Sequence, residues 1–274
     1  MTVDAEMWLP PWDGGLYAAN TSHHRAHDGW FRSSLPLRPA DRVLDLGCGA
    51  GDFTRTVADQ VPRGHVVGLD AQPSLLVEAR RRAGPNQTFV EGPVQRLASL
   101  LPDGGEFDVV MSRSAMHWVP LADHTALVAD VFRLLGPGGW FRLEMGGVGN
   151  IPVILPVLNA VSRSLDGPTT PWTFADPAFY LELLEAAGFS VRGGHVQAVA
   201  QRRAFDRASL IGWLHSQCLQ AYEVGLPAER RPAFRASVVA RLDDMRRHDG
   251  TFDQTFVRLD VLVQRPSGDL DRIA

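Results

Sequence analysis

Three glycines alternate with other residues in the sequence Asp45-Leu46-Gly47-Cys48-Gly49-Ala50-Gly51, directly after a short apolar run. The apolar run is typical of a buried strand, and the residues from Asp52 onward are typical of an amphipathic helix. A dinucleotide-binding turn has its third glycine three residues after the second, so that a pyrophosphate can lie at the helix N-terminus. Asp52 occupies that position here, and its carboxylate would repel a pyrophosphate. The spacing therefore argues against a nicotinamide or flavin dinucleotide.

Histidines and cysteines could instead bind a metal. His23 and His27 are four residues apart, but no helical glutamate follows the first histidine and no third ligand is nearby. Cys48 and Cys218 lack the spacing of a zinc site. We therefore expect no metal. All 27 basic residues are arginines, which excludes Schiff-base catalysis by lysine and a lysine-dependent phosphate loop.

The elements that must position these residues alternate between strand and helix. Five apolar runs read as strands, at residues 42–47, His65–Asp70, Gln87–Glu91, Phe107–Ser112 and Trp140–Met145. Three amphipathic segments between them read as helices, at Asp52–Val61, Pro73–Ala83 and Asp123–Leu135. This alternation predicts an α/β fold with a doubly wound, Rossmann-like parallel sheet. With two later strands, Phe189–Ala200 and Gln254–Gln264, we expect seven strands, mostly parallel, with the last strand antiparallel.

The regular alternation stops after residue 145. Further helical patterns fall between the late strands, and we expect them to form a cap over the carboxyl edge of the sheet, where doubly wound folds bind ligands. We place the cap insertions at about residues 146–178 and 205–250 of a domain spanning residues 41–274. Residues 1–40, which include a helix-like stretch with several aromatic and histidine side chains, are expected to form an N-terminal helical lid.

The glycine loop resembles the first motif of class I S-adenosylmethionine-dependent methyltransferases. The resemblance covers roughly residues 42–145 motif by motif and the rest of the chain more loosely. It implies S-adenosyl-L-methionine as cofactor and S-adenosyl-L-homocysteine as product. It also implies that Gly47, Gly49 and Gly51 pass under the methionine part of the cofactor, where a Cβ would collide. Asp45 would contact the ammonium group, and Asp70 would accept hydrogen bonds from both ribose hydroxyls.

The same resemblance assigns further cofactor contacts, and it contains one departure. Pro93 stands where the family usually has an acidic residue that binds the adenine amino group. The adenine contact is therefore expected from the Val94 backbone or the Gln95 side chain. Tyr17 would cover the sulfonium as a lid. The remaining expected cofactor contacts are Cys48, Ala71 and Ser112.

Two segments bear on the methyl acceptor. Residues 16–24 and the sequence His117-Trp118-Val119 resemble those of juvenile hormone acid methyltransferases. The broader layout, including a helix expected around Trp213 to Tyr222, resembles trans-aconitate methyltransferases, which also methylate a carboxyl group. Trp118 matches a tryptophan that orients the substrate carboxylate, although it could instead pack in the core. His24 replaces a glutamine, so it could donate a hydrogen bond to a carboxylate or act as a base for a hydroxyl. His117 is a third catalytic candidate, with a scaffold role as its alternative.

The expected function is therefore methyl transfer by in-line displacement to an oxygen of a small molecule, either a carboxylate or a hydroxyl. Two alternatives are an RNA or protein methyltransferase and a binding protein without turnover. The net charge of −4 and the pI near 6.1 argue against a nucleic-acid partner. The longest apolar stretch, Ile151–Val161, is short and interrupted by prolines, so we expect no membrane span. We expect a cytoplasmic monomer.

Overall fold

The computed structural model describes residues 29–102 and 106–268. Tyr17 and His24, two of the predicted site residues, lie outside this part of the chain, as do His23 and His27. The fold and the site below are built from the described residues.

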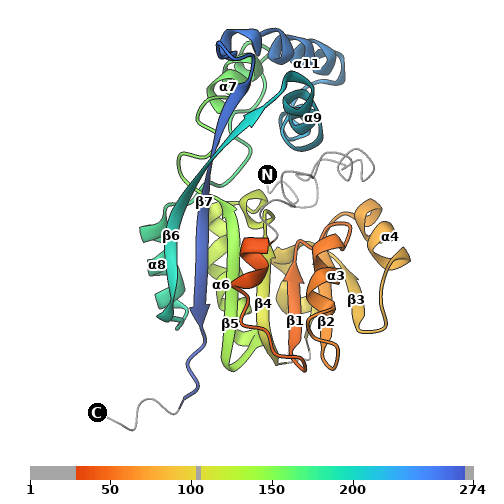
Figure 1. Ribbon diagram of the computed structural model, residues 1–274, viewed down its shortest axis with the longest axis vertical. Coiled ribbons are helices and arrows are strands. Elements are labelled where there is room, and N and C mark those ends of the chain that lie inside the picture. Colours follow the sequence, from red (N-terminus) through yellow and green to blue (C-terminus); the bar gives the residue numbers. More distant parts are fainter. Residues whose placement is uncertain (1–28, 103–105, 269–274) are drawn as a thin grey trace.

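The sheet has seven strands in the order β3-β2-β1-β4-β5-β7-β6 (Figure 1). The strands are β1 (Arg42–Leu46), β2 (His65–Asp70), β3 (Gln87–Glu91), β4 (Phe107–Arg113), β5 (Leu135–Gly146), β6 (Ser190–Phe205) and β7 (Phe252–Gln264). β1 to β5 pair in parallel, and β7 pairs antiparallel with both β5 and β6. The prediction of a Rossmann-like sheet with an antiparallel last strand is confirmed.

Helices cover both faces of the sheet. Their bounds are α3 (Asp52–Ala58), α4 (Pro73–Arg81), α5 (Leu97–Leu100), α6 (His124–Leu134), α7 (Leu155–Arg163), α8 (Pro177–Ala186), α9 (Arg207–Gln217), α10 (Leu219–Glu223) and α11 (Arg231–Ala240). Val43 and Val109 pack with Val57 in one core, whereas Leu44 and Val110 belong to a second core with the side chains of α6 and α8. Alternate strand residues thus point to opposite, helix-covered faces, which explains the continuous apolar runs.

Several elements differ in length from the sequence-based expectation. β5 begins at Leu135, directly after α6, rather than at Trp140. The intervening glycine-rich residues are a bulge, because the β4–β5 register shifts between Phe107 and Val109. β6 continues to Phe205, five residues beyond its expected end. A local apolar pattern did not show this extension because three of its five residues, Gln201, Arg202 and Arg203, are polar.

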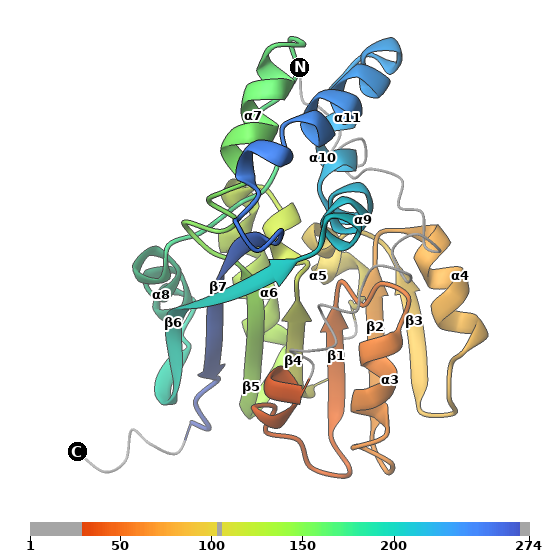
Figure 2. The same cartoon turned by 45° about the horizontal axis from the view of Figure 1, so that its top comes forward.

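The extended parts of β6 and β7 leave the sheet as a two-stranded ribbon (Figure 1). The β5–β7 pairing ends at Gly146 and Arg258, whereas β6 and β7 remain paired from Ala200–Val257 to Phe205–Phe252. The ribbon enters a group of helices formed by α7, α9, α10 and α11, which we call the cap helices. They share a separate apolar core with the ribbon, and Figure 2 shows them above the carboxyl edge of the sheet.

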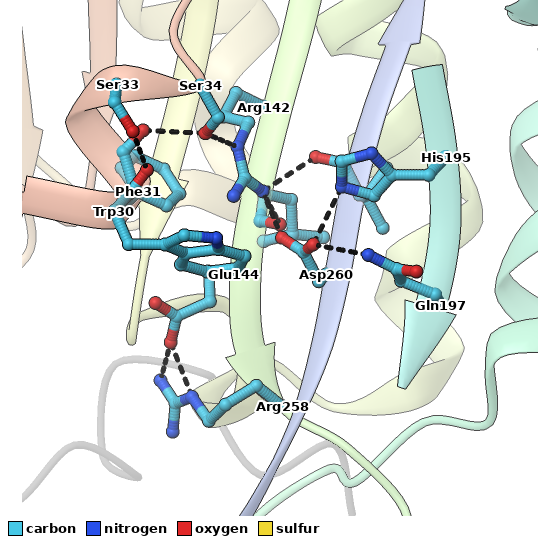
Figure 3. Close-up of polar contacts among 12 residues, drawn as sticks. Trp30, Phe31, Ser33, Ser34, Arg142, Glu144, His195, Gln197, Arg258 and Asp260 are labelled. Atoms are coloured by element: carbon cyan, nitrogen blue, oxygen red, sulfur yellow. Dashed lines mark hydrogen bonds and ion pairs between the residues drawn. The ribbon is translucent and has the colours of Figure 1, made fainter. Parts of the chain in front are cut away.

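A buried cluster of charged and polar side chains crosses β5, β7 and β6 below this edge (Figure 3). Arg142 and Asp260 are both fully buried, with 2.5 Å between the guanidinium nitrogen and the carboxylate oxygen. The other Asp260 oxygen lies 2.7 Å from His195 Nε2 and accepts a hydrogen bond from Gln197 at 3.1 Å. The carboxylate of Asp260 therefore links the last three strands of the sheet.

The same arginine holds the helical residues 29–33 against the sheet. The Arg142 guanidinium lies 4.3 Å from the ring centre of Phe31 and 5.2 Å from that of Trp30. Its Nε also donates to the Ser34 hydroxyl at 2.8 Å. Cation–π contacts and a charge-assisted hydrogen bond thus fix the point where the N-terminal segment joins the domain.

Candidate active site

The glycine loop joins the carboxyl end of β1 to the start of α3. Gly47, Gly49 and Gly51 all have positive φ, at 75°, 57° and 77°. The amides of Gly47 and Cys48 donate to the Leu69 carbonyl at 2.7 and 3.1 Å. The loop is therefore held to the end of β2 in a conformation that favours glycine.

The three glycines differ in what surrounds them. A Cβ on Gly47 would lie 2.2 Å from Ala115 Cβ, and one on Gly51 would lie 3.0 Å from Ala79 Cβ. Packing inside the protein accounts for these two glycines. Among the residues that the structure describes, no atom would lie within 4 Å of a Cβ on Gly49, so these residues leave open space beside the Gly49 backbone. The middle of the loop is where a ligand can approach the main chain.

Asp70 is built into the same loop. One of its oxygens accepts from the Gly49 amide and the other from the Gln72 amide, both at 2.8 Å. Burial raises the pKa of Asp70, and these amides act against that rise. A carboxylate has about four acceptor positions. Asp70 can therefore position the loop and still accept hydrogen bonds from a ligand.

Asp45 lies beneath the loop and is 4% exposed. Its carboxylate accepts a hydrogen bond from the Thr54 hydroxyl at 2.7 Å. Burial raises the pKa of Asp45 to about 6, against the lowering effects of Thr54 and the positive charge of Arg113. Asp45 is thus mostly ionised at neutral pH and is readily protonated in mild acid.

The other predicted cofactor contacts fall into two groups. Ala71, Val94 and Gln95 are half-buried and follow the carboxyl ends of β2 and β3, at the same edge as the glycine loop. The side chains of Cys48 and Ser112 are turned inward. Burial raises the pKa of the Cys48 thiol, and the Ser112 hydroxyl is fully buried and donates to the Leu46 carbonyl at 2.8 Å. The Ser112 side chain therefore joins β4 to β1.

A cavity of about 790 Å³, its mouth included, lies between this edge and the cap helices. It is lined by residues that follow β4, by the end of β5, by the segment between β5 and α8, by the ribbon and by α9. The cavity adjoins the glycine loop, because Ala115, which packs on Gly47, lies between the lining residues Ser114 and His117. His117 and Trp118 of the predicted catalytic set both line the cavity.

The geometry of His117 defines which of its nitrogens carries the proton. The Gly146 amide donates to His117 Nδ1 at 3.2 Å, so Nδ1 is an acceptor and the proton of the neutral ring is on Nε2. Burial, together with the positive charge of Arg258, lowers the pKa of His117 to about 3. His117 is therefore a neutral hydrogen-bond donor at physiological pH.

Trp118 forms part of an aromatic wall. Its ring lies 5.7 Å from that of Trp172 in a T-shaped contact and 5.8 Å from the ring of His117. Trp118 is half-buried. Its ring packs against the cap core and also lines the cavity.

A buried ion pair in the cavity wall was not predicted. Arg258 of β7 binds the carboxylate of Glu144 of β5 and donates to the Ser114 hydroxyl at 2.5 Å (Figure 3 draws the ion pair). Burial acts to raise the pKa of Glu144, but the charges of Arg258 and Arg113 outweigh it, so the pKa is lowered. Ser114 has a φ of 54°, an uncommon conformation for a residue other than glycine.

Two further arginines line the cavity. Arg113 ends β4, and its charge acts on both Asp45 and Glu144, so it lies between the glycine loop and the cavity. Arg203 belongs to the ribbon, and its guanidinium lies 5.5 Å from the ring centre of Phe256. Of the residues that the structure describes, three arginines and one glutamate thus contribute charged side chains to this cavity.

Residues 43–139 match the family model described as a methyltransferase domain. The matched part contains the glycine loop, both carboxylates and the strands that carry them. The chain is a class I S-adenosylmethionine-dependent methyltransferase. Its cofactor is therefore S-adenosylmethionine, as the glycine loop predicted.

Relatives extend the similarity of this methyltransferase beyond the matched domain. A trans-aconitate 2-methyltransferase from Variovorax paradoxus is 27% identical over 270 residues, which cover 93% of this chain and 98% of the relative. One of the same name from Deinococcus radiodurans is 32% identical over 58% of this chain and 62% of the relative. The crystal structure of YcgJ from Bacillus subtilis is similar in fold, with a TM-score of 0.61, 20% identity, and coverage of 89% of this chain and 100% of that chain.

The methyltransferase loop fits this cofactor. The open space before Gly49 leaves room for a ligand against the main chain. The remaining acceptor positions of Asp70 suit a pair of hydroxyl groups, and the buried negative charge of Asp45 suits a cation. The residues present thus match the ribose and the amino group of S-adenosylmethionine.

In residues 29–102 and 106–268, no group of three or more histidine, cysteine, aspartate or glutamate side chains could hold a metal ion. Within the same ranges, no helix has both the length and the apolar composition that crossing a membrane requires.

Proposed function

We propose that this methyltransferase transfers the methyl group to a carboxylate oxygen of a small organic acid. The observation that carries the proposal is the charge of the cavity beside the glycine loop, where the described lining residues include Arg113, Arg203 and Arg258 but only one carboxylate, Glu144. Arginine is well suited to binding a carboxylate because its planar fork can donate two parallel hydrogen bonds. Relatives matched over more than nine-tenths of this chain are named trans-aconitate 2-methyltransferase, which supports an acidic acceptor.

In this proposal the cofactor is bound by the glycine loop. S-adenosylmethionine supplies an electrophilic methyl group on a sulfonium. Gly47, Gly49 and Gly51 form the floor beneath its methionine part, Asp45 attracts its ammonium group and Asp70 accepts from its ribose hydroxyls. Ala71, Val94 and Gln95 border the adenine end, with Cys48 contributing its backbone.

The chain's own residues then bind and orient the acceptor. The arginines attract the acid, and the Nε2–H of His117 donates a hydrogen bond to it. Trp118 forms one wall and helps to exclude water. Orientation is the main task because a displacement reaction needs the nucleophile about 3 Å from the methyl carbon and in line with the leaving group.

The proposal requires no general base. A carboxylic acid with a pKa near 4 is already ionised at neutral pH, whereas a phenol with a pKa near 10 would have to lose a proton. His117 is poorly suited to accept that proton, since its pKa of about 3 makes it a very weak base. Its Nδ1 also already accepts from the Gly146 amide.

The domain limits and the N-terminal roles complete the proposal. Residues 146–178 and 205–250 would form the cap that closes the cavity, and residues 1–40 would form a lid carrying Tyr17 and His24. Neither residue lies in the described part of the chain, so their roles depend on the sequence resemblance.

Radiolabelled methyl transfer to a pool of small carboxylic and phenolic metabolites tests the proposal. We expect label in products that are hydrolysed by mild alkali, as methyl esters are and aryl methyl ethers are not. With both substrates saturating, the rate should be constant from pH 7 to pH 9. A tenfold rise per pH unit would indicate a hydroxyl acceptor. Label that appears in RNA or protein, or in no product despite cofactor binding, would reject the proposal.

A further inference from the structure

Aromatic side chains form much of the cavity wall. Trp118 and Trp172 contribute to the wall together with Phe174, and Trp213 and Phe256 contribute from α9 and β7. A small acid with several charges and little apolar surface would make few contacts with these rings. The aromatic wall therefore bears on what the acceptor carries besides its reacting carboxylate.

The first group of rings is centred on Trp172. Trp118 makes a T-shaped contact with Trp172 at 5.7 Å, and Phe174 stacks on it at 5.9 Å with 17° between the rings. Trp172 is 8% exposed and belongs to the cap core, so it has little freedom to turn. These contacts fix the orientation of the rings before a substrate enters.

The second group comes from the ribbon and α9. Trp213 and Phe256 are 5.3 Å apart in a T-shaped contact, and both are largely buried. Phe256 also carries the guanidinium of Arg203 on its face at 5.5 Å. The Arg203 guanidinium is thus held against this second group of aromatic rings.

Arg203 differs from Arg258 in its partners. Arg258 is bound by Glu144. Among the residues that the structure describes, no carboxylate lies within ion-pair distance of the Arg203 guanidinium, although Arg203 is half-buried. Its neighbour Arg202 faces the other side of the strand and pairs with Asp253 at the surface at 2.8 Å. Arg203 is therefore available to an anionic group inside the cavity.

We propose that the acceptor is an aromatic acid whose ring lies among Trp118, Trp172, Trp213 and Phe256, and whose second anionic group binds Arg203. The inference rests on the proposed function, because it assumes that a carboxylate near the glycine loop receives the methyl group. Aromatic rings pack against one another in edge-to-face and offset arrangements. A cavity lined by such rings therefore favours a planar aromatic ligand over a flexible open-chain ligand. Arg203 then selects acids with a second charge on the far side of the ring.

Titration calorimetry in the presence of S-adenosylhomocysteine tests this inference without turnover. The three ligands are phenylacetate, 4-carboxyphenylacetate and the open-chain acid trans-aconitate. We expect 4-carboxyphenylacetate to bind at least tenfold more tightly than either of the other two. Quenching of tryptophan fluorescence should accompany the binding of both aromatic acids.

Variants assign the effect to single side chains. Arg203→Met should weaken the binding of 4-carboxyphenylacetate at least tenfold and that of phenylacetate much less, because phenylacetate has no second anionic group. Arg202→Met, on the opposite face of the same strand, is the matched control and should change neither. Trp118→Leu should weaken the binding of both aromatic acids more than it weakens the binding of trans-aconitate. Circular dichroism spectra that match the parent protein would show that the variants are folded.

The outcomes separate this inference from the function on which it rests. If trans-aconitate binds and is methylated better than both aromatic acids, the aromatic acceptor is wrong but carboxyl methylation stands. If Arg203→Met affects all three ligands equally, the assignment of the second anionic group is wrong. If an aromatic acid binds as expected but only phenols are methylated in the assay above, the proposed function fails instead.

Discussion

Asp45 and Asp70 lie at the same edge of the sheet, but different groups stabilise their charges. Asp70 accepts hydrogen bonds from two backbone amides at 2.8 Å. Asp45 accepts one hydrogen bond, from the Thr54 hydroxyl, and its carboxylate is buried. Burial without many hydrogen bonds favours the protonated form. Asp45 is therefore the carboxylate of this loop that is most sensitive to mild acid.

A pH dependence of cofactor binding follows from the pKa of Asp45, which burial raises to about 6. The proposed contact between its carboxylate and the cofactor ammonium favours the ionised form, so the pKa of Asp45 should be lower in the complex. Affinity for S-adenosylhomocysteine should be constant above pH 7 and should fall as the pH decreases through 6, by up to tenfold per pH unit. Calorimetry from pH 5 to pH 8 measures this.

The matched variant for that experiment is Asp45→Asn. It should bind more weakly at pH 7.5 and show a much flatter dependence on pH, because it cannot be protonated in this range. A parent protein whose affinity is the same at pH 5 and pH 8 would contradict the role of Asp45.

The sequence predicted the glycine loop and its carboxylates because they lie within one local pattern. Gly47 to Gly51 are consecutive with β1, and Asp70 ends the next strand. The ion pair of Glu144 and Arg258 was not predicted, because 114 residues separate the two and the antiparallel register brings them together. A charged residue inside an otherwise apolar strand was the available signal.

Among the elements, β5, β6 and β7 are joined by the buried Arg142–Asp260 cluster. Strand positions near the glycine loop and the first residues of α3 and α4 followed from the sequence pattern, whereas both helices end two or three residues earlier than expected. The length of β6 did not, because its outer part pairs with β7 alone and exposes alternate side chains. A ribbon of two strands has no apolar run to indicate where it ends.

Removing the negative charge of this cluster should destabilise the protein. Asp260→Asn leaves Arg142 buried without its counter-ion, which costs about 3–5 kcal/mol of unfolding free energy. Urea denaturation followed by circular dichroism measures the loss. Glu78→Gln, which removes the exposed ion pair with Arg81, is the control and should cost less than about 1 kcal/mol.

A second substitution tests whether the buried charge is the cause. Replacing both partners, Arg142→Met with Asp260→Asn, should recover part of the stability, because no unpaired charge then remains. If Asp260→Asn unfolds at the same urea concentration as the parent protein, the cluster does not hold the three strands together.

In the whole molecule, two bodies are connected through the ribbon and through the chain segments on either side of α7. The sheet and its covering helices have cores of their own, and the cap helices share another with Phe205, Phe252 and Phe256. The cavity lies between the two bodies and takes its walls from both. Composition and periodicity indicated that helices are inserted after β5. They did not indicate which of these helices pack together, because that depends on contacts between distant segments, such as those of α7 with α11.

The cap helices should lose stability independently of the sheet. Phe252 is 1% exposed at the outer end of the ribbon, and Phe252→Ala should cost about 3–5 kcal/mol within the cap core. Amide hydrogen exchange in α7 and α9 should then accelerate by about a hundredfold or more, while that of β1 and β4 stays unchanged. Phe179→Ala, at a side chain that is 41% exposed, should have little effect. Equal acceleration throughout the chain would show a single cooperative unit.

The ribbon also determines how acceptor preference could be exchanged between relatives. Ala200 and Val257 are direct partners across β6 and β7. The chain therefore leaves the sheet and returns to it at one pair of neighbouring residues. Residues 201–256 hold Arg203, Trp213 and Phe256 within that single excursion. A chimera in which residues 201–256 are exchanged between two relatives would replace one side of the acceptor cavity as a unit. The methyl-donor site of the recipient protein would be unchanged.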